Sequence, residues 1–256
     1  METLNPSNST EHSLTPVGEL FKNAFVIYKE VFLKMILFPI YAGLIGFVPV
    51  AIVLLLWGVW SISAAFQVAS VFHLVINLIL GFFSVVALLF MLYVTGVGFI
   101  TSYLILKDPS IKFKPAMTEA RKCFWQYYYV SVLSGLAVMG GVILLIIPGL
   151  IFWVWFAFSS FVFMFEGLKG VAALKRSKEL AKGYWWPIVG RFAILFAISL
   201  ILGVPTWSMN QGSFAYESYS LLSSIIKFLI GPFYIVIGYL IFKELQQFKG
   251  ESKIVK

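Results

Sequence analysis

The longest uncharged stretches of the chain set the class of fold. No Asp, Glu, Lys or Arg lies between Lys34 and Lys107, a run of 72 residues, and none lies in the 43 residues from Cys123 to Phe165. A third apolar region, Phe192 to Phe242, contains only Glu217 and Lys227 as charged residues. An α-helix needs about 20 apolar residues to cross roughly 30 Å of hydrocarbon, so each region is long enough for two crossings. The sequence therefore predicts a membrane protein with six spans.

The composition excludes other classes. Apolar residue types make up 61% of the 256 residues and charged types only 12%, whereas soluble domains carry about 25% charged residues. A soluble enzyme, a disordered chain and a coiled coil are therefore excluded. The single cysteine, Cys123, rules out an internal disulfide and a cysteine-based metal cluster, and the two histidines are too far apart for the common zinc patterns. No metal or cofactor is predicted.

The expected fold is all-α, because backbone groups in lipid must find their hydrogen-bond partners within a helix. The spans are predicted at about 35–59, 75–106, 126–147, 150–165, 186–205 and 221–242. Between the third and fourth spans, Pro148-Gly149 is predicted to form a tight turn. Proline disfavours helix at the residue before it, and glycine permits positive φ.

The distribution of basic residues predicts the orientation. The N-terminal flank, the segments 107–122 and 167–191 and the C-terminal tail hold 18 of the 19 Lys and Arg residues, and Lys227 is the exception. Cytoplasmic loops carry such an excess of basic residues. Both termini are therefore expected in the cytoplasm, and a bacterial inner membrane is the default location. Because the basic residues flank apolar runs, membrane lipid is the expected partner rather than nucleic acid.

Three cytoplasmic segments have the pattern of amphipathic surface helices, at about 16–33, 114–125 and 170–184. Their apolar stripes are Val17, Leu20, Phe21, Ala24, Phe25, Tyr28 and Phe32; Ala116, Met117, Ala120 and Phe124; and Val171, Leu174, Ser177, Leu180, Ala181 and Tyr184. Such helices are expected to lie in the interface, with the apolar face in lipid and the basic face toward anionic headgroups. Each precedes an apolar hairpin, which fits either a degenerate threefold repeat or simply an even number of spans with cytoplasmic ends.

The membrane domain is accordingly expected to cover residues 15–245. It would be preceded by a disordered cytoplasmic segment, 1–14, and followed by a basic cytoplasmic tail, 246–256.

The third surface segment carries the densest basic cluster, Lys175, Arg176, Lys178 and Lys182, followed by Tyr184-Trp185-Trp186. Topology and an interfacial aromatic belt explain both features without a specific ligand. Contact with anionic headgroups of the inner leaflet is the functional interpretation, at about 1 kcal/mol per basic residue near the surface.

Two further charged residues lie near span ends. Lys227 lies on the outer side of the sixth span, where a charge is costly unless it reaches the surface or pairs, with Glu217 as the candidate partner. It is the fifth candidate headgroup contact. Glu166 ends the fourth span. It fits a structural anchor paired with a basic residue such as Lys169 better than a proton or cation site, because water reaches it there.

A local pattern resembles a known family. It consists of Ile147-Pro148-Gly149, Glu166-Gly167, Ala172–Ser177, Leu180, Gly183 and Trp185-Trp186. The pattern is similar to the membrane domain of some bacterial glycerophosphodiester phosphodiesterases and to stand-alone six-helix YciC-like proteins. The resemblance implies a six-helix membrane architecture, with Pro148, Gly149, Glu166, Ser177, Trp185 and Trp186 as its structural motif, and it identifies architecture better than activity. Relatives often carry a basic residue after the Pro-Gly turn, where this chain has Trp153 and Trp155.

The sequence contains no phosphate-cradling loop, nucleophile elbow or pair of carboxylates within a span. The expected function is therefore non-enzymatic, acting through contacts with membrane lipids or with a membrane protein partner. The alternative is a transporter or channel for a lipid or a small neutral solute, because prolines such as Pro49, Pro148 and Pro205 could break the spans. An enzyme that acts on lipid headgroups is suggested only by the resemblance.

Overall fold

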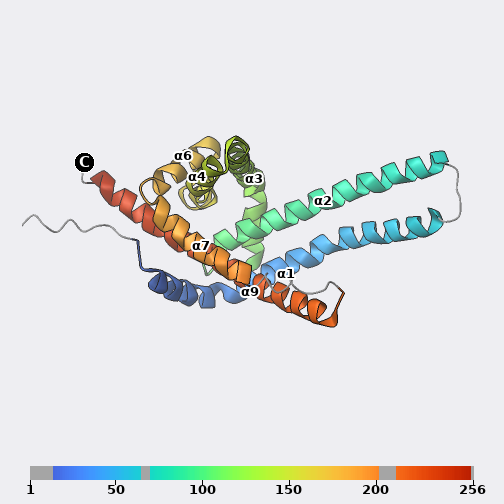
Figure 1. Cartoon of the computed structure of the whole chain (residues 1–256), viewed down its shortest axis with the longest axis horizontal. Helices are drawn as coiled ribbons and strands as arrows, with labels where there is room; N and C mark the ends of the chain where they lie inside the picture. The colour runs from blue at the N-terminus through green and yellow to red at the C-terminus, as the bar shows by residue number, and fades with distance from the viewer. Residues whose placement is uncertain (1–13, 65–69, 202–211, 255–256) are drawn as a thin grey trace, which may run out of the picture.

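The computed structural model describes residues 14–64, 70–201 and 212–254, and within these ranges all regular elements are helical (Figure 1). Helices α1 (Val17–Ala64) and α2 (Ser70–Lys107) form a long hairpin, and α3 (Phe113–Leu144) and α4 (Ile146–Phe156) form a second one. The chain continues through the single turn α5 (Ser159–Phe161) and the π-helix η1 (Val162–Glu166). Helices α6 (Gly170–Ala181), α7 (Trp185–Ile201) and α9 (Phe214–Ile254) complete the fold.

The structure confirms a chain of long apolar helices. Five helical segments are long and apolar enough to cross a membrane, and the α6–α7 pair, bent by 98°, would make a sixth. The five segments are Val17–Ser61, Phe72–Lys107, Phe113–Leu144, Ile146–Glu166 and Phe214–Gly250. The predicted fifth span corresponds to α7, and its last residues, 202–205, lie outside the described residues, as do 1–13 of the N-terminal segment.

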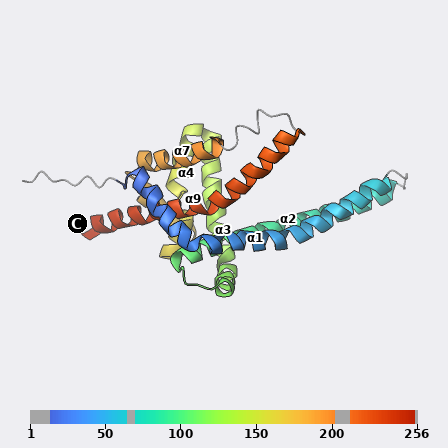
Figure 2. The same cartoon turned by 90° about the horizontal axis from the view of Figure 1, so that it is seen from below.

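Two of the predicted surface helices are not separate elements. Helix α1 runs through the expected boundary at residue 34, and α3 runs through the boundary at residue 125. Neither junction contains glycine or proline, and extending a helix adds one hydrogen bond for each residue ordered. Helix α1 nevertheless changes direction along its length (Figure 2). Only the third segment stands alone, because Gly183, with φ of 93°, ends α6 before α7 begins.

The two hairpins do not run side by side. Figure 2 shows α3 lying across the direction of the α1–α2 hairpin. Gly96 of α2 permits this crossing, since a Cβ atom there would lie 2.7 Å from a ring carbon of Phe124 of α3. The same ring packs edge-on against Tyr93, with 4.7 Å between the ring centroids. An aromatic side chain seated over a glycine therefore joins the hairpins.

The far end of the α1–α2 hairpin is held by hydrogen bonds between tryptophan and polar side chains. Trp60 Nε1 donates to Asn77 Oδ1 at 2.8 Å, and Trp57 Nε1 donates to Ser84 Oγ at 3.1 Å. Both bonds join α1 to α2, so they fix the pairing of the two helices at a distance from the core.

The turn between α3 and α4 lies at Leu145, three residues before the predicted Pro148-Gly149 turn. Leu145 is extended, with φ of −166° and ψ of 152°, and Pro148 lies inside the first turn of α4. Proline is tolerated there because the first N–H groups of a helix have no intrahelical acceptor. Gly149 serves packing instead, since a Cβ atom on it would lie 2.3 Å from Val142 Cγ2 and 2.9 Å from the Val142 backbone.

The core lies where the bases of the hairpins meet α6 and α9. Phe38, Phe158 and Phe242 are among its largest fully buried side chains. Tyr103 packs edge-on against Phe161, which in turn stacks on Phe242, with ring centroids 5.0 and 5.7 Å apart. By contrast, the hairpins expose large apolar side chains, such as Leu55 at 70% and Ile146 at 81%. Apolar surface on this scale is typical of helices surrounded by lipid.

We expect Gly149→Ala to destabilise the protein by about 1–3 kcal/mol, the usual cost of overpacking, because the added methyl group meets the Val142 backbone. The matched control is Gly140→Ala, since no heavy atom lies within 4 Å of its Cβ position. Alanine is a better helix former than glycine, so the control should be neutral or slightly stabilising. Thermal unfolding in detergent measures both variants, and equal melting temperatures would contradict this account of the turn.

Candidate functional site

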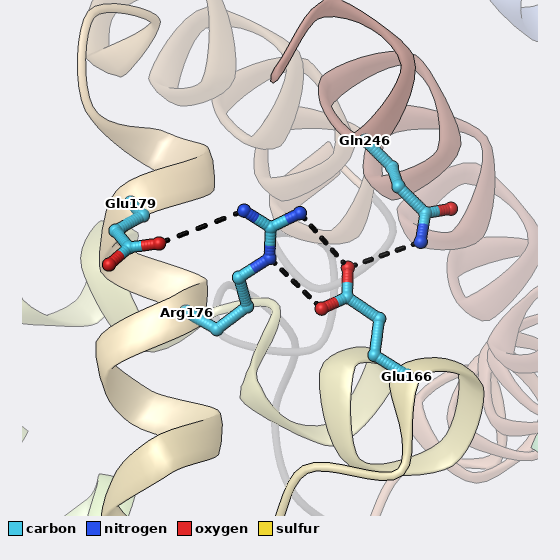
Figure 3. A network of polar contacts seen from close by, with 4 residues as sticks. All are labelled: Glu166, Arg176, Glu179 and Gln246. Atoms are coloured by element: carbon cyan, nitrogen blue, oxygen red, sulfur yellow. Dashed lines mark hydrogen bonds and ion pairs between the residues drawn. The ribbon is translucent and has the colours of Figure 1, made fainter. Parts of the chain in front are cut away.

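Glu166 is the centre of a polar network that joins three elements (Figure 3). From α6, Arg176 donates through Nε to Glu166 Oε2 at 2.9 Å and through Nη2 to Oε1 at 3.4 Å. Gln246 of α9 donates to Oε1 at 3.1 Å, and Glu179 lies 3.7 Å from the other end of the guanidinium. The side chains of Arg176 and Glu166 are only 18% and 14% exposed, so the pair is shielded from water.

The partner of Glu166 is Arg176 rather than Lys169, the residue suggested by the sequence. Lys169 is exposed and precedes α6 in extended conformation, whereas Arg176 lies on the face of α6 that is turned toward η1. The planar guanidinium can bind both carboxylate oxygens at once, which an ammonium group cannot do. Arg176 was also a candidate headgroup contact, and its guanidinium is instead engaged within the protein.

The Ser177 hydroxyl forms hydrogen bonds with backbone groups at the break in the fourth predicted span. The chain leaves regular helix between α4 and α5, and the fully buried Ser177 side chain of α6 reaches this break. Its hydroxyl donates to the Trp155 carbonyl at 2.7 Å and accepts from the Phe158 N–H at 3.2 Å. An unpaired backbone group in apolar surroundings costs free energy. The two hydrogen bonds of Ser177 therefore stabilise the chain where the helix is interrupted.

The lysines of α6 point away from this packed face. Lys175, Lys178 and Lys182 are exposed, and the Lys178 ammonium lies 3.9 Å from the centre of the Trp155 ring, in cation–π contact. Trp185 and Trp186 follow at the start of α7 with their rings edge to face at 4.6 Å, and Trp186 is 76% exposed. Three lysines of the predicted basic cluster are thus exposed, and one of them, Lys178, contacts a tryptophan.

The apolar stripes of the expected surface helices are used largely inside the protein. On α6, Leu174, Ser177, Leu180 and Ala181 are buried, and on α3, Ala116, Ala120 and Phe124 are buried. The first stripe is divided, with Leu20 and Ala24 buried and Phe25 and Phe32 exposed. Most of the stripes on α6 and α3 therefore pack against the protein, while Val171 of α6 stays 52% exposed.

Lys227 lies in a different place, in a hollow of about 490 Å³ bounded by α1, α2 and α9. It is the only charged residue among those that line this hollow, and its side chain is exposed. Glu217, the partner suggested by the sequence, lies in the first turn of α9, ten residues earlier. This separation corresponds to a rise of about 15 Å along a helix, which is too far for an ion pair. Lys227 makes no hydrogen bond or ion pair with the residues that the structure describes.

Sequence reasoning missed Gln246 and the lining of this hollow. Gln246 falls in the predicted basic tail, although α9 continues through it to Ile254. A usable signal for the hollow was present, since Pro232 follows Lys227 by five residues in an otherwise unbroken apolar run. In the described part of the chain, no group of three or more His, Cys, Asp or Glu residues is placed to hold a metal ion.

No protein-family model, curated protein or solved structure matches the chain.

We expect Glu166→Gln to lower the stability by about 1–3 kcal/mol. Breaking a buried ion pair costs several kcal/mol and breaking an exposed one less than about 1 kcal/mol, and this pair is mostly buried. The matched control is Glu119→Gln, which removes a carboxylate from the Lys122 pair, whose side chains are 65% and 52% exposed. The control should change stability by no more than about 0.5 kcal/mol. A Glu166 variant as stable as the control in detergent denaturation would show that the network does not hold α6 in place.

We expect Ser177→Ala to cost about 1–3 kcal/mol, because it leaves the Trp155 carbonyl and the Phe158 N–H buried without their partner. The control is Ser224→Ala, an exposed serine that bonds only to Ser220 of its own helix. Amide hydrogen exchange by mass spectrometry would report the site directly. Faster exchange at residues 155–160 is expected in the Ser177 variant and not in the control, and unchanged exchange there would contradict the role of this hydroxyl.

Proposed function

We propose that the chain is a multi-pass membrane protein that acts through contacts with membrane lipids rather than by catalysis. The observation that carries the proposal is the exposed lysine face formed by Lys175 and Lys178 of α6 and Lys182 at its end, with the Lys178 ammonium over the Trp155 ring. Lysine and tryptophan together are typical of the membrane–water interface, where lysine attracts anionic headgroups and tryptophan lies at headgroup level.

The way α6 is held supports this proposal. The buried Ser177 contacts and the Arg176–Glu166 ion pair fix one face of the helix against the protein. The opposite face, which carries the three lysines, is therefore presented outward in one orientation. Charged side chains on a helix that is fixed in place lose less conformational entropy on binding than the same side chains on a mobile segment. In this proposal both termini and α6 lie on the cytoplasmic side, as the distribution of basic residues predicts.

A specific observation also favours the alternative, a transporter or channel for a lipid or a small neutral solute. Pro232 interrupts the hydrogen bonding of α9 beside the hollow that contains Lys227. Substrate sites in transporters are usually built where a helix loses regular backbone hydrogen bonds beside a cavity, although α9 itself remains one continuous helix. Flux of lipid or solute across proteoliposomes would favour this alternative, whereas stable binding without flux would favour the lipid-contact function. Catalysis on headgroups has no comparable observation in its support.

We expect the purified protein in mild detergent to retain phosphatidylglycerol in preference to phosphatidylethanolamine when both are offered in equal amounts. The variant Lys175→Gln/Lys178→Gln/Lys182→Gln should retain at least tenfold less of the weakly bound phosphatidylglycerol, the fraction that a detergent wash removes, at about 1 kcal/mol for each lysine near the surface. Native mass spectrometry with lipid identification measures both.

The control variant is Lys22→Gln/Lys112→Gln/Lys114→Gln, which removes the same charge from exposed lysines outside α6. It should retain phosphatidylglycerol like the unmodified protein. An equal loss in both variants would show that only net charge matters, and no headgroup preference in the unmodified protein would overturn the proposed role of the α6 lysines.

A further inference from the structure

The hollow around Lys227 has the size and lining of a ligand site. Its volume of about 490 Å³ lies within the range of small-molecule pockets, about 300–1,000 Å³. Its lining residues come from α9 on one side and from the α1–α2 hairpin on the other, and Figure 1 shows where α9 passes the hairpin. Most lining side chains are apolar, among them Phe47, Val50, Met91, Phe99 and Ile235. We name this hollow the α9 groove.

Glycines keep the α9 groove open. Gly43 and Gly46 of α1 and Gly231 of α9 line it, and no heavy atom lies within 4 Å of the position where a Cβ atom would be added at any of them. Gly98 of α2 has a different role, since a Cβ atom there would lie 2.9 Å from the Phe38 ring. Side chains at the first three positions would therefore project into unfilled space and occupy the groove.

Besides Thr95 and Ser102, whose hydroxyls donate to carbonyls of their own helix, two polar features interrupt the apolar lining. Pro232 has no N–H, so the carbonyl of Phe228 lacks its usual partner one turn later in α9, and both residues line the groove. Lys227 precedes Phe228 directly and supplies the only positive charge of the lining. An ionisable group among apolar helices is costly when unpaired and marks a functional site by default.

The charge and the apolar surface together specify the ligand. Lys227 has no carboxylate partner among the residues that the structure describes, so its ammonium can pair with an external anion. The apolar walls suit a hydrocarbon chain, whose burial contributes about 0.8 kcal/mol for each CH₂ group. A molecule that joins an anion to a hydrocarbon chain is an anionic lipid, and the surrounding exposed apolar helices place the groove where lipids are available.

We propose that the α9 groove binds an anionic phospholipid, with one acyl chain between α1, α2 and α9 and a phosphate oxygen accepting from Lys227 Nζ. This site is separate from the lysine face of α6, so either can fail without the other. It differs from generic contact with bulk lipid because one molecule would be held at one place by a charge and a shaped groove.

The test uses the full-length protein in mild detergent, with phosphatidylglycerol as the probe. Native mass spectrometry counts the retained lipid, and thermal unfolding measures the stabilisation on adding it. Lys227→Gln should lower the tightly retained phosphatidylglycerol about tenfold and remove its stabilising effect. Gly46→Leu should lower the retention of any lipid in the groove, because the added side chain occupies part of the space that the acyl chain would take.

The control for the groove-filling variant is Gly58→Leu, on the same helix but outside the groove and also with open space at its Cβ position. It should retain lipid like the unmodified protein. Gly43→Leu is a second groove-filling variant in case Gly46→Leu does not give a monodisperse protein. Retention unchanged in a folded groove-filling variant would overturn the site.

Three comparisons separate the remaining outcomes. If Lys227→Gln retains phosphatidylglycerol normally while Gly46→Leu does not, the proposed pairing with the headgroup is wrong. If the unmodified protein retains a free fatty acid and no phospholipid, the phospholipid assignment is overturned. The triple lysine variant of α6 should lose its weakly bound lipid and keep the tightly bound one. Loss of both lipids would show that the α9 groove is not an independent site.

Discussion

The fold depends on how one interrupted helix satisfies its backbone hydrogen bonds. Between α4 and α5 the chain leaves regular helix among buried apolar side chains, where an unpaired carbonyl or N–H group costs several kcal/mol. Ser177 bonds to both sides of this break, so α6 must dock with that face inward. The docking brings Arg176 to Glu166, and Gln246 adds α9 to the same network. The position of α6, and with it the direction of its lysines, therefore follows from the break.

Glycine has two opposite uses in this protein. Gly96 and Gly149 are sites of close approach, where a methyl group would meet a neighbouring ring or backbone. Gly43, Gly46 and Gly231 face space that is not filled by the protein. The first use lets helices approach closely, between the hairpins at Gly96 and within the second hairpin at Gly149, and the second use leaves the α9 groove. The same residue type thus marks both the tightest packing and the one cavity proposed to bind lipid.

The sequence correctly predicted long apolar helices in an all-helical chain, and the boundaries of several predicted elements differ from those in the structure. Helical apolar segments were predictable because uncharged runs of 72 and 43 residues leave few other structures. The junctions at residues 34 and 125 were not, because the change from a polar to an apolar environment does not require a break in the helix. The turn at Leu145 was misplaced by three residues because Pro148 is compatible with the first turn of a helix.

The sequence by itself determined that the chain forms apolar helices and that its basic residues gather in particular segments, since both follow from composition and spacing. Only the tertiary structure decided which charged side chains form ion pairs and which remain exposed. Arg176 and Lys175 are neighbours in the sequence, yet Arg176 is paired with Glu166 and Lys175 is exposed. The environment of Lys227 is also set by tertiary structure. Three helices form a groove around it, and the residues that line this groove include no carboxylate. Pairing and cavity shape depend on contacts between distant segments, which local patterns do not specify.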